Sequence, residues 1–273
     1  MEENKNYGDF FVKNNQPEEN KTINDDNESI TISKVKQIAV ILVGWLGLQL
    51  FASVIVLIAT LIIGDVTSLP ENDLVKLDGY INIASYAVIT IALLAILGLP
   101  VIKKLIKQFT NLEKVGKGFM YGGILLGTSI AYNMIIMLIF PDFGGSNDNQ
   151  NAVDSLITQM PVLSFFMVVI FAPLVEEITY RLGLTGIFKN KNKIVALIIS
   201  SVIFGLIHFN FMSEDMKTEL IALPSYIISG VVLGLAYLNE DSLATSITAH
   251  LTNNLIAFLT TFIPAEAIIS RLF

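Results

Sequence analysis

The sequence predicts an all-α protein, a polytopic membrane helix bundle with about seven transmembrane helices. Of its 273 residues, 53% are hydrophobic and only 15% are charged, and the mean hydropathy is +0.65. Soluble domains usually carry about a quarter of their residues charged. The chain also contains seven stretches of at least 20 residues without Asp, Glu, Lys or Arg, and about 20 apolar helical residues cross a bilayer. Strands of a membrane barrel would be half as long and would alternate in polarity.

Composition excludes several classes of function. The net charge of -7 leaves no basic surface for phosphates, so we expect no nucleic-acid partner. Cysteine is absent, which rules out disulfides, thiol catalysis and cysteine-bound metal. The chain has only two histidines. Because no long soluble domain is present, any chemistry must take place in the membrane bundle itself.

The chain divides into a tail, an N-terminal helical region and a core. Residues 1–35 hold eight acidic residues without an apolar period, so we expect a disordered acidic cytoplasmic tail and no cleavable signal peptide. Residues 36–117 would form the first transmembrane helices, 118–263 the core and 264–273 a short C-terminal tail. The charge-free stretches are 37–64, 79–102, 118–141, 155–175, 194–213, 220–239 and 242–265. An eighth span would result if a long stretch re-enters the membrane.

Lysines predict the orientation of a multi-pass protein of the cell membrane. They concentrate in the loop after the second stretch and in the loop after the fourth, whereas the alternate loops are mainly acidic. Positive residues remain on the cytoplasmic side, which places the N-terminus inside. Apolar residues recur at helical spacing between the lysines of 103–114, so we expect an interfacial helix there.

Ionisable residues in membrane helices are costly, by about 3 kcal/mol each, and therefore indicate function. The fourth stretch runs into Glu176, Glu177 and Arg181, and apolar residues continue to about 188, which keeps the carboxylates within the membrane. Glu177 and Arg181 are four apart and should pair on one helix face. Glu176 is turned about 100° away and has no such partner. Burial suits this free acid to general-base work.

Both histidines lie in charge-free stretches. His208 is as far after the lysine-rich turn near Asn192 as Glu176 is before it, so a helical hairpin would place the two side by side. His250 and Asn254 share a helix face, but the distance of His250 from its nearest turn predicts a shallower position. Two small residues four positions apart in a helix predict close packing against another helix. Two such pairs are present, Gly123 with Gly127 and Gly230 with Gly234.

Three motifs together resemble the CPBP family of intramembrane proteases, the group of CAAX prenyl proteases and bacteriocin-processing enzymes also called Abi. The motifs are Glu176-Glu177-x-x-x-Arg181, Phe204-x-x-x-His208 and His250-x-x-x-Asn254, in the family's order and on separate hydrophobic segments. The resemblance implies that Glu176, assisted by His208, activates water. It implies that His250 and Asn254 stabilise the oxyanion, and that Glu177, Arg181 and Phe204 orient the site.

Metal dependence is a separate question. Zinc held by Glu176, His208 and His250 with an open water position is one arrangement. However, no helix carries two histidines around a glutamate in the usual zinc-peptidase spacing. A carboxylate would have to serve as third ligand, which leaves only the arginine-paired Glu177 as a base. We therefore expect hydrolysis driven by glutamate without a cofactor.

The sequence thus predicts an endopeptidase that cleaves a membrane-associated peptide or protein near the cytoplasmic half of the bilayer. By analogy with bacterial members of the family, its role would be maturation of a bacteriocin or signalling peptide, or self-immunity. One alternative is a non-catalytic membrane scaffold that regulates a sensor or a transporter. Another is a transporter with Glu176, Glu177 and His208 as a proton relay, but the inverted repeats typical of transporters are missing.

Overall fold

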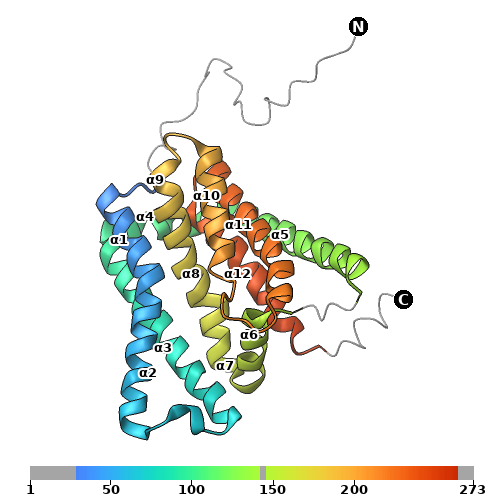
Figure 1. The fold of residues 1–273 in the computed structure, drawn as a ribbon. Coiled ribbons are helices and arrows are strands. Elements are labelled where there is room, and N and C mark those ends of the chain that lie inside the picture. The colour runs from blue at the N-terminus through green and yellow to red at the C-terminus, as the bar shows by residue number, and fades with distance from the viewer. Residues whose placement is uncertain (1–28, 142–145, 264–273) are drawn as a thin grey trace, which may run out of the picture.

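The chain folds into a bundle of long helices (Figure 1). The computed structural model describes residues 29–141 and 146–263, and all regular elements in these ranges are helical. This confirms the predicted all-α membrane bundle. Most of the predicted N-terminal tail and the whole of the predicted tail 264–273 lie outside the described residues.

Several elements join end to end into longer helices. Lys34–Ile63 and Pro161–Phe188 are each one continuous helix that contains π-helical turns. In chain order the elements are α1 (Lys34–Leu42), η2 (Val43–Gly47), α2 (Leu48–Ile63), η3 (Val66–Ser68), α3 (Glu71–Leu97), α4 (Leu99–Thr110), α5 (Leu112–Ile139), α6 (Asp148–Gln159), α7 (Pro161–Ser164), η4 (Phe165–Phe171), α8 (Ala172–Glu177), η5 (Ile178–Thr185), α9 (Gly186–Phe188), α10 (Lys193–Leu206), α11 (Met216–Glu240) and α12 (Leu243–Thr260).

Five helices of the described chain are long and apolar enough to cross a membrane. All seven charge-free stretches contain a helix, but two of these helices differ from the expected spans. Helix α10 has 14 residues and ends at Leu206, well before the predicted end of its stretch. Helix α12 has 18 residues, and its Thr, Ser, Asn and His side chains lower its hydropathy. The number of spans therefore stays a prediction.

Helix α6 has no counterpart among the predicted elements, because residues 142–154 were expected to form a loop. Asn147 begins this helix by accepting a hydrogen bond from the Gln150 backbone N–H at 3.2 Å. Such a cap, followed by Asp148 in the first turn, is a strong helix start. Pro161 then starts a new helix, since proline fits the first turn but cannot continue a helix. The fourth charge-free stretch is therefore divided between two helices.

The lysine-rich segment forms the expected amphipathic helix, with shifted bounds. Helix α4 ends at Thr110 rather than near 114. Asn111 ends it and also caps α5, accepting hydrogen bonds from the backbone N–H groups of Glu113 and Lys114 at 3.1 and 3.3 Å. Leu105 is buried in the bundle, so α4 is anchored to the protein as well as placed for an interface.

The first half of α12 is the centre of the bundle. Every residue in 242–250 is buried, and Ile247 belongs to a core cluster that also contains Val40 of α1, Leu93 of α3 and Ile178 of η5. Small and polar residues dominate this half of α12, which lets other helices approach its backbone closely. Helix α5 packs along it and then diverges from the bundle (Figure 1).

Glycines mark two of these close approaches. A Cβ atom on Gly230 would lie 2.8 Å from the Ser201 Cα, which confirms the predicted close packing at this glycine and identifies α10 as the partner helix. The predicted pair in α5 is wrong. Gly123 and Gly127 face open space, and the close contact is made instead by Gly122, whose Cβ would lie 2.7 Å from the Thr252 Cβ. Spacing alone does not say which face of α5 meets α12.

This difference predicts unequal effects of the same substitution at two glycines of one helix. Gly122→Val should push α5 away from α12 and lower stability by about 1–3 kcal/mol, the usual cost of overpacking. Gly127→Val should have little effect, because nothing lies within 4 Å of its Cβ position. Thermal unfolding of both variants in the same detergent tests this. Equal loss of stability in both variants would show that α5 packs differently.

Candidate active site

The two adjacent carboxylates lie in the middle of the continuous helix Pro161–Phe188. Both turns that flank them, η4 and η5, are π-helical. Pro173 has no backbone N–H, so it cannot form the normal helical bond to the preceding turn, which is free to widen. Wide turns of this kind occur frequently at functional sites. The helix continues to Phe188, as predicted, and both carboxylates are buried within the bundle.

Glu177 is the centre of a buried polar cluster. The Arg181 Nε atom donates to Glu177 Oε2 at 2.9 Å, and both side chains are fully buried. The Ser246 hydroxyl donates to the same oxygen, and the His250 Nδ1 atom lies 3.1 Å from Glu177 Oε1. The Arg181 guanidinium also lies 5.3 Å from the centre of the Phe204 ring, a cation–π contact. The structure therefore contains the predicted Glu177–Arg181 pair and adds two partners from α12.

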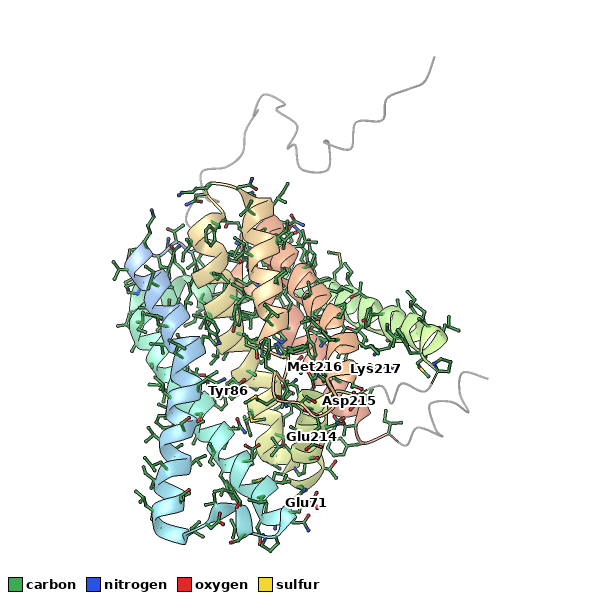
Figure 2. The ribbon with its side chains drawn as sticks, in the orientation of Figure 1. Glu71, Tyr86, Glu214, Asp215, Met216 and Lys217 are labelled. Carbon is green, nitrogen blue, oxygen red and sulfur yellow. The ribbon has the colours of Figure 1, made fainter. Side chains whose placement is uncertain are left out.

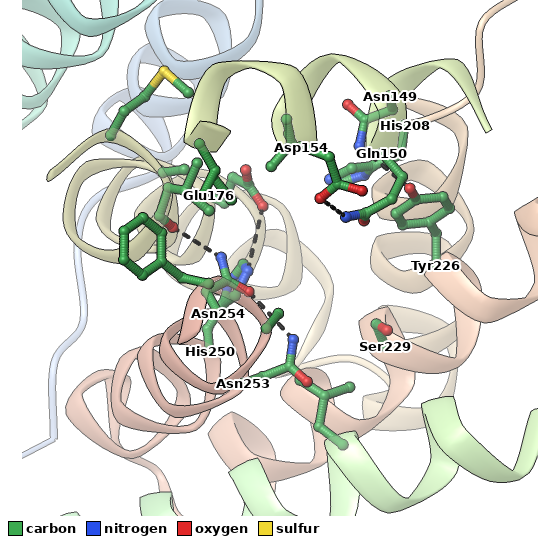
Figure 3. Close-up of a pocket in the computed structure, with 18 of the residues that line it drawn as sticks. Asn149, Gln150, Asp154, Glu176, His208, Tyr226, Ser229, His250, Asn253 and Asn254 are labelled. Carbon is green, nitrogen blue, oxygen red and sulfur yellow. Dashed lines mark hydrogen bonds and ion pairs between the residues drawn. The ribbon is translucent and has the colours of Figure 1, made fainter. Parts of the chain in front are cut away.

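Glu176 has a different environment. Its side chain faces a cavity of about 220 Å³ (Figure 3), yet the residue is only 8% exposed. Within the described residues, its Oε2 atom has no hydrogen-bond partner. Among the described residues, the ionisable group within ion-pair distance is the His250 Nε2 atom, 3.9 Å from Oε2. A buried carboxylate oxygen without a donor is costly, and this oxygen is the group in the site best placed to bind an added water or ligand.

His208 lies in the turn after α10 and lines the same cavity. Its Nδ1 atom lies 2.8 Å from the Phe204 carbonyl, so Nδ1 carries a proton and donates it, and Nε2 is left as the acceptor of the neutral ring. The ring stacks on Tyr226 with 4.7 Å between ring centres. The histidine within ion-pair distance of Glu176 is therefore His250, which the count from the turn had placed too shallow.

The depth prediction failed because α12 does not begin at the surface. Asp241 takes a left-handed backbone conformation, with φ 42°, and the next nine residues are all buried. A count from the turn assumes that the turn lies at the membrane edge. Here the turn residue Asp241 is exposed, but the chain is covered by other helices from Ser242 onward, and His250 reaches Glu176 about two and a half helical turns after Asp241.

The side-chain amides of α12 complete one wall of the cavity. Asn254 Nδ2 donates to the Val168 carbonyl of η4 at 2.9 Å, and its Oδ1 accepts from Asn253 Nδ2 at 3.2 Å. One N–H of Asn254 is fixed to the backbone of the helix that carries Glu176, and its second N–H is a further donor. The three motifs identified in the sequence therefore meet at one cavity.

Residues outside the motifs build the opposite wall (Figure 3). They come from α6 and from the first half of α11, and they include Asn149, Gln150, Asp154, Tyr226 and Ser229. Within residues 29–141 and 146–263, neither lysine nor arginine lines this cavity. The sequence did not predict these cavity residues, because residues 142–154 were expected to form a loop and the polar side chains of α6 are typical of one.

A second, more apolar cavity of about 470 Å³ lies on the other side of Glu176. It is lined mainly by residues of η2, η5, α10 and the turn after α10, including Trp45, Tyr180 and Phe209. Tyr86, in the middle of α3 (Figure 2), lines both cavities, as does Glu176 itself. The free carboxylate thus lies between a polar cavity and an apolar one.

Buried Glu219 connects the wall of α6 to the turn that carries His208. Its carboxylate accepts hydrogen bonds from Asn147 Nδ2 at 3.2 Å and from the backbone N–H groups of Asp148 and Asn210, both at 3.0 Å. The Tyr226 hydroxyl donates to Asn147 Oδ1 at 3.0 Å. Glu219 stands at the start of α11, where acids are common, so its sequence position carried no signal of this role.

The side chains do not form a ready metal site. In residues 29–141 and 146–263, no group of three or more His, Cys, Asp or Glu side chains could hold a metal ion. The arrangement as it stands therefore does not fit zinc on Glu176, His208 and His250.

Comparisons with known proteins agree with this site. Residues 158–256, which contain the three motifs, match a family model described as type II CAAX prenyl endopeptidase Rce1-like. The membrane-embedded CAAX protease MroQ of Staphylococcus aureus (strain USA300) is 30% identical over 180 residues, which cover 62% of this chain and 70% of that relative. No solved structure matches the chain.

Fold and matches together define a membrane-embedded peptidase. The chain belongs to the CPBP family, the CAAX-protease-like intramembrane endopeptidases.

The Glu219 contacts predict that this distant residue holds His208 in place. Glu219→Gln replaces one acceptor oxygen by an NH2 group, which must face at least one N–H donor, so the link between α6 and the turn at Asn210 should loosen. We expect roughly tenfold less cleavage of the enzyme's substrate, equivalent to about 1.4 kcal/mol. The measurement is product formation by purified enzyme at matched folded amounts. Glu214→Gln removes a nearby exposed carboxylate and should leave the rate unchanged; equal rates in both variants would rule out this role.

Proposed function

We propose that this intramembrane peptidase hydrolyses a peptide bond of a membrane-associated peptide or protein, with Glu176 as the base that activates water. The observation that carries the proposal is Glu176 itself, a buried residue that lines the cavity and whose Oε2 atom has no hydrogen-bond partner among the described residues. A water bound there would donate a proton to Oε2 as it attacks the scissile carbonyl. The same carboxyl would then pass the proton to the leaving amine, as general acid–base catalysis requires.

The neighbouring polar groups have roles that fit their hydrogen bonds. His208 Nε2 is the acceptor of the neutral ring, which suits help with proton transfer at the water. His250, when protonated, donates from Nε2 toward the cavity, and Asn254 has a second amide N–H; these two would stabilise the oxyanion. Glu177 and Arg181 hold His250 and the helix in place. No step in this scheme requires a metal ion.

The orientation that we propose places the lysine-rich end of the bundle in the cytoplasm. Ten described lysines gather there: Lys34, Lys36, Lys103, Lys104, Lys107, Lys114, Lys117, Lys189, Lys191 and Lys193. Three contacts between helix ends connect them into one surface, Lys36 with the Leu97 carbonyl at 2.8 Å, Lys117 with Glu240 at 2.7 Å and Lys189 with Asp241 at 3.1 Å. Of the lysines that the structure describes, only Lys76 and Lys217 lie at the other end.

The cavity lies in the half of the bundle away from these lysines. Helix α10 starts at the lysine-rich turn, and its cavity residues come at its far end, Phe204 and His208. Helix α11 runs back, and its cavity residues come early, at Tyr226 and Ser229. With the lysines inside, the substrate would enter from the extracytoplasmic side. This position conflicts with the expectation of cleavage in the cytoplasmic half of the bilayer.

The substrate in this proposal is a peptide or the outer end of a membrane segment, as in maturation of a bacteriocin or signalling peptide or in self-immunity. Similarity to a CAAX protease supports proteolysis at a membrane. The alternative of a non-catalytic scaffold has no comparable support, because a scaffold has no use for an unpartnered buried carboxylate that faces a cavity.

Replacing the proposed base tests the reaction. Glu176→Gln keeps the size of the side chain but removes the proton acceptor, so it should abolish hydrolysis, by at least about a hundredfold for a lost acid–base group. Peptides from membranes and medium of cells with the wild-type protein and with the variant, at matched abundance, are compared. New termini that vanish with Glu176→Gln and persist with the exposed control Glu71→Gln identify the substrate. Identical profiles in all three cultures would contradict a glutamate-dependent protease.

The side of entry is tested by thiol labelling, because the chain has no native cysteine. Thr261 lines the cavity and is exposed, and Lys191 is exposed in the lysine-rich turn. In intact cells, a membrane-impermeant maleimide should label Thr261→Cys and should reach Lys191→Cys only after the membrane is permeabilised. The reverse pattern would place the cavity on the cytoplasmic side.

A further inference from the structure

One charged group of the cavity has no part in the proposed hydrolysis. Asp154 of α6 lines the cavity and is partly buried. Its Oδ1 atom accepts a hydrogen bond from Gln150 Nε2 at 2.8 Å, and it forms no ion pair with any residue that the structure describes. Figure 3 shows this carboxylate on the wall across the cavity from Glu176. Gln150 fixes its direction and leaves Oδ2 free.

The charges around the cavity are unbalanced. Among the residues that the structure describes, its lining contains two carboxylates, Asp154 and Glu176, and neither lysine nor arginine. The Glu176 Oε2 atom lacks a donor and the residue is more than nine-tenths buried. A carboxylate that is partly removed from water gains strongly from an opposite charge. Arg181 cannot supply that charge, because it is fully buried against Glu177.

We propose that Asp154 binds a lysine or arginine side chain of the substrate, next to the bond that is cut. The proposal rests on the proposed function of this cavity and adds to it a class of substrate, peptides with a basic residue near the cleavage site. Asp154 lies on the wall opposite the proposed base, so a peptide that crosses the cavity meets both carboxylates. Residues of α6 would thus determine specificity, while the α8 helix and α12 carry out the reaction.

Binding to an inactive enzyme tests the proposal independently of cleavage. The Glu176→Gln protein in nanodiscs is titrated with fluorescent nine-residue apolar peptides whose central residue is Lys, Gln or Glu. We expect the Lys peptide to bind roughly tenfold more tightly than the Gln peptide, the size of one charge-assisted contact. Adding Asp154→Asn, which keeps the acceptor for Gln150, should remove this preference. Adding Asp154→Lys should shift the preference to the Glu peptide.

A matched control is Glu214→Gln, which removes an exposed carboxylate outside the cavity and should keep the preference for Lys. Equal binding of the three peptides, no binding of any, or a preference that survives Asp154→Asn would overturn the proposal. The same peptides with wild-type Glu176 separate it from the proposed function. Preferential binding without cleavage would contradict the peptidase mechanism alone, and cleavage without a charge preference would contradict only the role of Asp154.

Discussion

The buried charge of Glu177 is the constraint on which the centre of the molecule depends. An ionised group in a membrane helix costs about 3 kcal/mol or more unless partners surround it. Here the partners come from two helices: Arg181 lies one turn further along the same helix, and Ser246 and His250 come from α12. The Ser246 hydroxyl oxygen also lies 3.0 Å from the Leu233 carbonyl of α11, so its single proton is shared between the two acceptors. Satisfying one carboxylate therefore fixes how α12 lies against both of its neighbours.

The same constraint leaves Glu176 free. Successive residues of a helix point about 100° apart, so the helix face that gives Glu177 to its partners turns Glu176 toward the cavity. Two chemically identical side chains thus acquire different roles from position alone. His250 connects them, since its Nδ1 atom faces Glu177 and its Nε2 atom faces Glu176. The structural cluster in this way also orients the proposed reaction.

Local patterns in the chain predicted much of this arrangement. The absence of charge over long stretches indicated membrane helices, and the four-residue spacing of Glu177 and Arg181 indicated their ion pair, which the structure contains. The motifs around His208 and His250 indicated a shared site, and both histidines line the cavity. These predictions succeeded because each depends on helical periodicity within one segment, or on the cost of polar groups in a membrane.

Other features, such as the depth of a residue and the face by which a helix packs, depend on the tertiary structure and could not be predicted from local patterns. The depth of His250 follows from the buried start of α12, and the contact face of α5 follows from Gly122 rather than from Gly127. Helix α6 covers the cavity because Glu219, some 70 residues away in sequence, binds its first turn. The sequence by itself determined the fold class and the chemical groups of the site. The tertiary structure decided which residues lie next to these chemical groups, through contacts between distant segments. Helical spacing in the sequence specifies which side chains share a helix face, but not what packs against that face.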